Sequence, residues 1–157
     1  WENLRRDMVD SVNLMSWNIQ GLSTYVKRHR VHSFIRRHKI QIALLQEMHL
    51  TDEESQKLHK KWRGQMYSAT YSSYARGVTI WIAPQVPFWA QNIKADIEGR
   101  YVITYGLFDG KEISLLGIYA LNTDNRDFFH TIKQELIPYV GTPLILVGDF
   151  NCVMDRV

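Results

Sequence analysis

Four apolar segments of this sequence each end on a polar side chain that can bind a metal ion or a phosphate group. The segment LMSWN ends at Asn18, ALLQE at Glu47, LGIY at Tyr119 and LVGD at Asp149, with Asn151 two residues further on. In layered α/β proteins, ligands bind where rigid strands pass into loops. If these four ends lie at one edge of the fold, they form a single polar site.

The predicted site is rich in oxygen ligands. It contains two carboxylates, two amides and one phenol, and none of the four strand ends carries Cys or His. Such hard ligands suit Mg²⁺ or Mn²⁺ better than Zn²⁺. The matching reaction class is phosphoester hydrolysis, in which one carboxylate orients or deprotonates a water and the amides hold phosphoryl oxygens. Each residue alone is more simply explained as a cap, turn former or strand end, so this prediction depends on the whole set.

The first part of the chain predicts the elements that must position Asn18 and Glu47. Apolar runs at 12–18 and 40–47 are typical of strands, and the basic segment between them has helical spacing. We expect the buried stripe of that helix to contain Val31, Phe34, Ile35 and His38. Thr51 and Glu54 have the spacing of a capping box and begin a second helix.

The rest of the chain predicts several strands, one more helix and a last strand. The apolar runs are 78–83, 101–108, 112–119 and 144–149. Asp109-Gly110 between two of them is typical of a hairpin, and an amphipathic helix ends near Pro138. A single sheet does not accommodate this many strands without splitting. We therefore predict an α/β fold with two sheets packed face to face and flanked by helices, a four-layer αββα sandwich.

The composition is that of one compact domain. The 157 residues are 45% hydrophobic and 22% charged, close to globular averages. The longest apolar runs are far shorter than the ~18 to 20 residues that cross a bilayer, so we expect no membrane span. No secretory signal is recognisable, and the one cysteine, Cys152, is expected to be a small packed side chain. These features favour an intracellular protein, and the start at Trp1 suggests part of a longer chain.

Positive charge is concentrated in the first part of the sequence. Residues 1–63 contain 12 Lys and Arg against 7 Asp and Glu, whereas residues 64–157 contain 7 against 9. The centre of the excess is the segment 27–39, with six Lys or Arg, three His and no acid. Such a cluster can follow a phosphate backbone, although a solvated helix face is the simpler interpretation.

Six short segments resemble, in order, the motifs of the endonuclease/exonuclease/phosphatase superfamily. They are SWNIQGL at 16–22, LLQEMH at 44–49, RGV at 76–78, GRY at 99–101, IYALN at 118–122 and GDFN at 148–151. The residues of these segments are most similar to those of the endonuclease domain at the start of the reverse-transcriptase polyprotein of vertebrate non-LTR (long interspersed) retrotransposons. The resemblance implies a Mg²⁺- or Mn²⁺-dependent domain that nicks DNA in the nucleus and belongs to a polyprotein with a reverse transcriptase.

The resemblance also implies a role for each site residue. Glu47 would be the metal ligand, Asn18 would help hold the metal and the phosphate, and Tyr119 would contact the phosphate. Asp149 would position or activate the attacking water, and Asn151 would stabilise the transition state. Weaker candidates for contacts to DNA phosphates are Arg76 and Asn122, together with Lys27, Arg28 and Arg30 from the basic segment.

The sequence also departs from the family pattern. Family members end with another pair of strands and a Ser-Asp-His or similar motif, for which we find no counterpart, and Leu121 replaces a usual Pro. We therefore expect residues 1–157 to be a single incomplete domain that lacks its last strands. Loss of a group that stabilises phosphoryl charge costs on the order of 10²-fold to 10³-fold in rate, so weak or absent turnover is expected. We expect His49 to be a loop residue, and His29 and His32 to face solvent.

Two other functions remain open. A non-catalytic module that binds nucleic acid or a partner through residues 27–39 predicts DNA affinity that falls steeply with salt and does not need Glu47 or Asp149. A phosphoesterase of the same fold acting on a lipid headgroup is less consistent with the basic first third of the chain.

Overall fold

The computed structural model describes residues 11–123 and 126–152, which form two four-stranded sheets and the helices that cover them. The elements in chain order are β1 (Leu14–Asn18), α1 (Tyr25–Arg37), β2 (Ile42–Gln46), α2 (Asp52–His59), β3 (Gln65–Ala69), β4 (Val78–Ile82), β5 (Phe88–Ala95), β6 (Tyr101–Phe108), β7 (Lys111–Tyr119), α3 (Arg126–Leu136), the 3₁₀ helix η1 (Ile137–Tyr139) and β8 (Leu144–Asp149). The strand order is β1-β2-β4-β3 in the first sheet and β5-β6-β7-β8 in the second.

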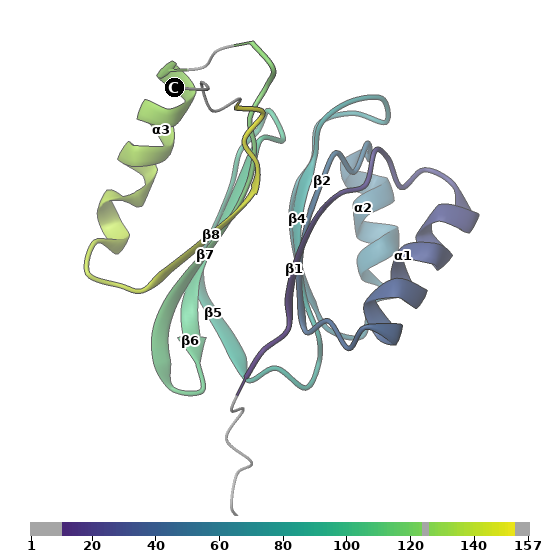
Figure 1. The fold of residues 1–157 in the computed structure, drawn as a ribbon, viewed down its shortest axis with the longest axis horizontal. Coiled ribbons are helices and arrows are strands. Elements are labelled where there is room, and N and C mark those ends of the chain that lie inside the picture. The colour runs from purple at the N-terminus through teal and green to yellow at the C-terminus, as the bar shows by residue number, and fades with distance from the viewer. Residues whose placement is uncertain (1–10, 124–125, 153–157) are drawn as a thin grey trace, which may run out of the picture.

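The two sheets face each other, with helices on both outer sides (Figure 1). Figure 1 shows α1 and α2 against the first sheet and α3 against the second. Successive strand residues point to opposite faces, so Leu44 of β2 packs between the sheets while Leu45 packs under the helices. Phe128 and Ile132 of α3 pack on the outer face of the second sheet. These three apolar clusters confirm the predicted four-layer sandwich.

Local hydrogen bonds define where the first two helices begin. The side chain of Thr24 accepts a hydrogen bond from the backbone nitrogen of Lys27 at the start of α1. At α2 the predicted capping box is present, since Thr51 and Glu54 each accept from the other's backbone nitrogen. The acidic residues that follow in the first turn of α2 also interact favourably with the positive end of the helix dipole.

The predicted buried stripe of α1 is only half correct. Val31 and Ile35 are buried, but Phe34 is 39% exposed and His38 is exposed. The helix lies over β2 and β4, whereas its Phe34 side overhangs the edge strand β1, where Phe34 contacts Trp17 at a ring distance of 5.1 Å. Because the sheet does not extend further beneath that side, Phe34 is covered only in part, by Trp17 and His38.

Each sheet ends in a parallel pair of strands joined by a helical crossover. The first pair is β1-α1-β2 and the second is β7-α3-β8. Within the described residues β1 and β8 are edge strands, and they contact each other across the sandwich. No helix in the described residues has the length and apolar character needed to span a membrane.

Candidate active site

The carboxyl ends of the two parallel pairs form the candidate site. In the first sheet Asn18 lies opposite Gln46, the residue before Glu47, and in the second Tyr119 lies opposite Asp149. Parallel strands end at the same edge of their sheet, and β1 contacts β8, so all four strand ends meet at one edge. This edge is at the top in Figure 1. The structure therefore brings together the four strand ends singled out in the sequence.

Asn18 connects the two carboxylates of the site. Its amide nitrogen Nδ2 donates to Glu47 Oε1 and to Asp149 Oδ2, each at 2.9 Å. Its Oδ1 accepts from the backbone nitrogen of Gln20 at 3.2 Å, which fixes the orientation of the amide. A neutral double donor thus lies between two like charges, one from each sheet, and reduces their mutual repulsion.

Two further side chains contact Glu47. His49 Nε2 lies 3.3 Å from Glu47 Oε2, so this histidine is in the loop that we predicted but also belongs to the site. The phenol of Tyr119 forms a hydrogen bond with Glu47. Burial, this hydrogen bond and the charges of Glu47 and Asp149 raise the pKa of Tyr119 to about 12, against a smaller opposing effect of Arg76. The site thus favours the protonated phenol, which is able to donate.

Asn151 is held by the loop that follows β8. Its backbone nitrogen donates to Asp149 Oδ1 at 3.1 Å, and its Nδ2 donates to the carbonyl of Ala120 at 2.6 Å. An open cavity of about 790 Å³ lies beside it and is lined by residues that include Asn18, Asn122 and Asp149. The amides and one carboxylate thus face a space large enough for a phosphate-bearing ligand.

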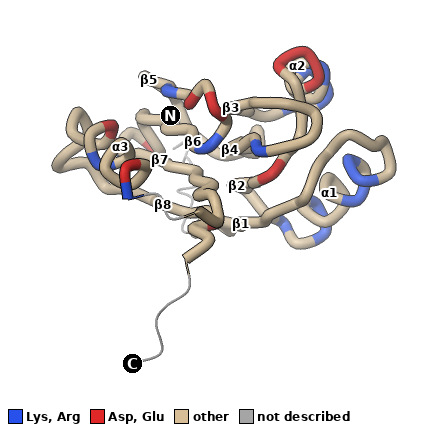
Figure 2. The backbone as a smooth tube through the Cα atoms, turned by 90° about the horizontal axis from the view of Figure 1, so that it is seen from above, with Lys and Arg blue, Asp and Glu red and all other residues tan. Residues whose placement is uncertain are grey.

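Two of the predicted phosphate-binding cations, Lys27 and Arg28, are hydrogen-bonded to backbone carbonyls. Lys27 Nζ donates to the carbonyl of Gln20 at 2.6 Å, and Arg28 Nε donates to the carbonyl of Leu22 at 2.5 Å. These two side chains therefore hold the loop after β1. Arg30 is exposed on α1, whose Lys and Arg residues are visible in Figure 2.

Arg76 lies close enough to the site to influence Tyr119, but its charge is partly compensated. Its Nη1 is 3.3 Å from Glu98 Oε2, and its guanidinium lies 4.4 Å from the ring centroid of Tyr71. Arg76 therefore reaches the edge of the site as one member of an ion pair.

Strained backbone is concentrated around these side chains. Five non-glycine residues near the site have φ between 45° and 60°: Gln20, Glu47, His49, Arg76 and Asn151. Left-handed backbone costs about 1–2 kcal/mol for most L-residues. Backbone hydrogen bonds hold it in place, including Gly21 N to Glu47 O (2.6 Å), His49 N to Arg76 O (2.9 Å) and Gly77 N to Gly99 O (3.0 Å). Such local strain, compensated by the surrounding structure, is typical of functional sites.

Two expectations about sulfur and histidine side chains are wrong. Cys152 is exposed, not packed; it lies three residues beyond β8, an edge strand that has no neighbouring strand on one side among the described residues. His32 does not face solvent: it is half-buried, with ring distances of 5.5 Å to Trp62 and 5.0 Å to Trp81. His32 lies away from the carboxylate site, whereas Cys152 lines the cavity beside Asp149.

Sequence reasoning missed three polar residues near the strand ends. Gln46 is buried and hydrogen-bonds to Ser16 Oγ at 3.2 Å, and both line the cavity. His49 contacts Glu47 as described above. The segment LLQE carried a signal for Gln46, because the residue before a strand-end ligand lies at the same edge of the sheet.

Among the described residues, no group of three or more His, Cys, Asp or Glu side chains is placed to hold a metal ion. A cation at this edge would therefore depend on the two carboxylates, neutral oxygens and water. Such a donor set fits Mg²⁺, which proteins commonly bind through one or two carboxylates while it keeps several waters.

Two stacked sheets with carboxylates and amides at their shared edge define the chain as an α/β sandwich with a candidate site for phosphoester chemistry. The chain belongs to the endonuclease/exonuclease/phosphatase family, whose model matches residues 15–157. The resemblance inferred from the six segments is thereby confirmed at the level of the family.

Known proteins of similar sequence and fold include a transposon protein and DNA-related enzymes. The Transposon TX1 uncharacterized 149 kDa protein of Xenopus laevis is 24% identical over 152 residues, which is 92% of this chain and 11% of that protein. The structure of D. rerio TDP2 complexed with single strand DNA product has a TM-score of 0.63 and 21% identity, over 91% of this chain and 62% of that one. AP endonuclease from Leishmania major has a TM-score of 0.68 and 16% identity, over 88% and 54%. The chain thus spans only part of each protein.

Proposed function

We propose that this domain hydrolyses a phosphodiester bond of DNA with the help of a divalent cation, and so nicks one strand. The observation that carries the proposal is the bridge made by Asn18, which holds together Glu47 and Asp149 from opposite sheets. Asn18 and Asp149 also line the cavity. Two carboxylates so close together favour a bound cation, and the neighbouring amides are suited to phosphoryl oxygens.

Glu47 would be the main protein ligand of the cation, Mg²⁺ or Mn²⁺, with Asn18 beside it. When bound, the cation would neutralise negative charge that develops on the phosphoryl group. Asp149 is the candidate for orienting the attacking water and accepting its proton, because its carboxylate faces the cavity and is fixed by Asn18 and by the backbone of Asn151.

The remaining site residues would position and stabilise the phosphate. Asn151 and Asn122 would donate to phosphoryl oxygens. The phenol of Tyr119, uncharged at physiological pH, would orient Glu47 and contact the phosphate. His49, in contact with the same carboxylate, limits the positions that the Glu47 side chain can adopt.

DNA is the proposed substrate because of the named relatives. One is a transposon protein, one was solved with a single strand DNA product, and one is an AP endonuclease. We extend this to a domain of a longer polyprotein that includes a reverse transcriptase and acts in the nucleus. Arg30 and Asn122, which are exposed, and Arg76, which is half-buried in its ion pair, are then candidates for contacts to the DNA backbone.

A supercoiled-plasmid nicking assay with Mg²⁺ or Mn²⁺ tests this function. The isosteric variants Glu47→Gln and Asp149→Asn should each reduce nicking by on the order of 10²-fold or more, because each removes a charge at the reacting phosphate. The matched control is the pair Asp109→Asn and Glu112→Gln, which makes the same two chemical changes at the exposed β6–β7 hairpin. The control should nick at the parent rate.

A second readout separates metal binding from turnover. Mn²⁺ should raise the thermal unfolding temperature of the parent and of the hairpin control, but not that of the doubly substituted site variant. A folded parent that neither nicks DNA nor responds to Mn²⁺ contradicts the proposal. A response to Mn²⁺ without nicking restricts the proposal to a metal-binding site. DNA binding that weakens with salt and persists in the variants Glu47→Gln and Asp149→Asn supports the non-catalytic module instead.

A further inference from the structure

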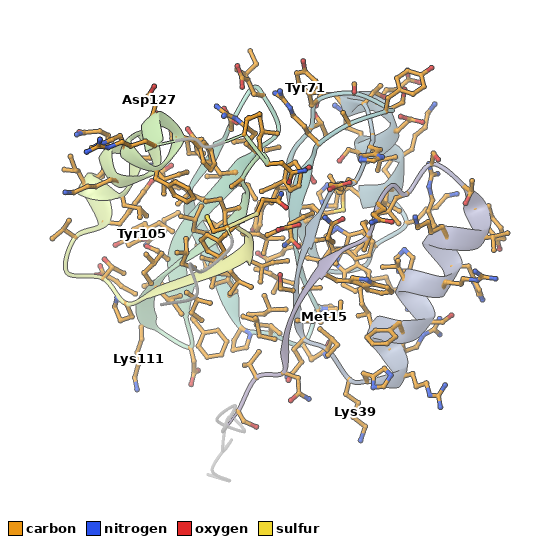
Figure 3. All side chains as sticks on the ribbon, turned by 45° about the horizontal axis from the view of Figure 1, so that its top comes forward. Met15, Lys39, Tyr71, Tyr105, Lys111 and Asp127 are labelled. Atoms are coloured by element: carbon orange, nitrogen blue, oxygen red, sulfur yellow. The ribbon has the colours of Figure 1, made fainter. Side chains whose placement is uncertain are left out.

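A second cavity lies at the opposite end of the first sheet from the candidate active site. It has a volume of about 700 Å³ and is formed where the carboxyl end of α1, the segment after α2 and the segment after β4 meet the amino end of β1. Figure 3 labels Lys39 at this lower end of α1. The volume is within the range of cavities that bind small ligands.

The charge around this cavity has one sign. Four cationic side chains line it, and no Asp or Glu does. They are Arg36, Lys39, Lys61 and Arg63. In the described part of the chain none of the four makes an ion pair or a side-chain hydrogen bond, whereas Lys57, Lys94 and Arg100 each lie in an ion pair. The cavity thus carries four positive charges that no described acidic residue compensates.

The simplest alternative is that these cations stabilise the ends of α1 and α2. A helix carboxyl end carries only about half a negative charge, so two ends offset about one of the four cations. Many of the terminal carbonyls also already have backbone partners: Phe34 O accepts from His38 N, and Leu58 O accepts from the backbone nitrogens of Lys61 and Trp62. Helix capping therefore does not account for the cluster.

The cavity also has an aromatic and apolar part. Trp62 and Ile40 line it, and the rings of Trp62, His32 and the buried Trp81 contact one another. The indole nitrogen of Trp62 donates to the carbonyl of Ile82 at 3.2 Å, which fixes the ring. A fixed aromatic ring beside several cations is suited to a ligand that joins a flat ring to a phosphate.

We propose that this cavity binds the phosphate of a nucleotide unit, with the cations around the phosphate and Trp62 and Ile40 against the base or sugar. The unit can come from a free mononucleotide or from a nucleic acid strand, since both present the same chemistry. The site is separate from the Glu47 and Asp149 site and does not depend on the nuclease proposal. A domain that nicks DNA at one edge would then hold a nucleotide at the other.

Titration calorimetry with inorganic phosphate, AMP and a short single-stranded oligothymidylate tests the site. AMP should bind with one site per chain and more tightly than phosphate. Arg36→Gln combined with Arg63→Gln should weaken AMP binding by at least about tenfold, because two charge-assisted contacts are lost. The control is Arg37→Gln with Arg126→Gln, which removes two exposed guanidinium groups outside this cavity and should leave AMP binding unchanged.

His32 provides a second readout that does not depend on heat signals. Its pKa is lowered by burial, by the charge of Arg36 and by the nearby His29. A bound phosphate adds negative charge beside His32, so AMP should raise its pKa in an NMR titration of the imidazole signals. Exposed histidines such as His130 should respond less.

The binding experiments distinguish a nucleotide site from a simple phosphate site and from no site. Equal binding of phosphate and AMP contradicts the nucleotide assignment. Undiminished AMP binding in the folded Arg36→Gln, Arg63→Gln variant, or no binding of either AMP or oligothymidylate to the parent, contradicts the site. Binding of the oligonucleotide alone identifies the strand as the source of the nucleotide. The variant Glu47→Gln with Asp149→Asn should retain this binding, so failure of one proposal does not imply failure of the other.

Discussion

At the scale of single residues, Asn18 is the centre of the candidate site. Its amide donates to one carboxylate from each sheet, and its carbonyl oxygen is occupied by the backbone of Gln20. The strand-end pattern predicted that Asn18, Glu47 and Asp149 are near neighbours. It did not predict the bridge, because that depends on how two sheets stack, and a one-dimensional pattern does not contain that distance.

Tyr119 should make the stability of the fold depend on alkaline pH. Its pKa is raised from 10.0 to about 12, so between these values the unfolded chain has lost a proton that the folded chain keeps. This contribution is fully present below pH 10 and is lost as the pH rises towards about 12. Tyr119→Phe should therefore make the decline of the free energy of unfolding with pH shallower.

Urea unfolding at several pH values on both sides of 10 measures this effect. The pKa of Tyr101 is also raised to about 12, so the decline should become shallower in Tyr119→Phe without disappearing. Tyr74→Phe is the control, because Tyr74 is 88% exposed. An unchanged pH profile in Tyr119→Phe contradicts the assigned environment of the phenol.

At the scale of elements, the periodicity of apolar residues predicted well whether a segment is a helix or a strand. It predicted less well which face of the element is buried. The capping box of α2 and the buried strands β2 and β4 follow directly from residue types. The strand β5 has no comparable apolar run, because most of its residues are exposed, and it was not identified individually. The stripe of α1 was misplaced at Phe34 and His38, since helical spacing does not reveal that the edge strand β1 ends the sheet there.

The loops around the site should be sensitive to changes at Gly99. This residue has φ of 67°, its carbonyl accepts from Gly77 N, and an added Cβ would lie 2.9 Å from Tyr71 Cβ. Gly99→Ala should lower the free energy of unfolding by about 2–3 kcal/mol, of which about 1 kcal/mol is backbone strain and the rest is the steric clash. Nicking activity should decrease as well.

Gly110→Ala is the matched control for this change. Gly110 has φ of 79°, but an added Cβ meets nothing within 4 Å. Its cost should be limited to the strain of about 1 kcal/mol. If urea unfolding shows the same loss of free energy of unfolding in both variants, the close approach of residue 99 to Tyr71 does not contribute to the loss.

At the scale of the whole molecule, both sheets have an edge strand on the same side. Among the described residues, β8 has a neighbouring strand, β7, on one side only. Leu144 and Leu146 of β8 are each 41% exposed. A row of unpaired backbone groups next to exposed leucines favours pairing with another chain.

Leu146→Lys should therefore reduce self-association of the purified chain. A charged side chain on an edge strand opposes edge-to-edge pairing. Ile97→Lys is the control, because Ile97 is 90% exposed but lies in the loop between β5 and β6. Sedimentation velocity over a range of concentrations should show fewer oligomers for Leu146→Lys alone, and equal behaviour of parent and variant would exclude the β8 edge as the contact.

The bridge from Asn18 to Asp149 joins residues 131 positions apart in the chain. At ribosomal rates, on the order of ten seconds separate the synthesis of these two residues. During that interval the first sheet can already carry Asn18 and Glu47, but the second carboxylate does not yet exist. Until then a nascent chain has no complete pair of acidic groups, and the chemistry proposed for this edge becomes available only when β8 has been made and docks against β7.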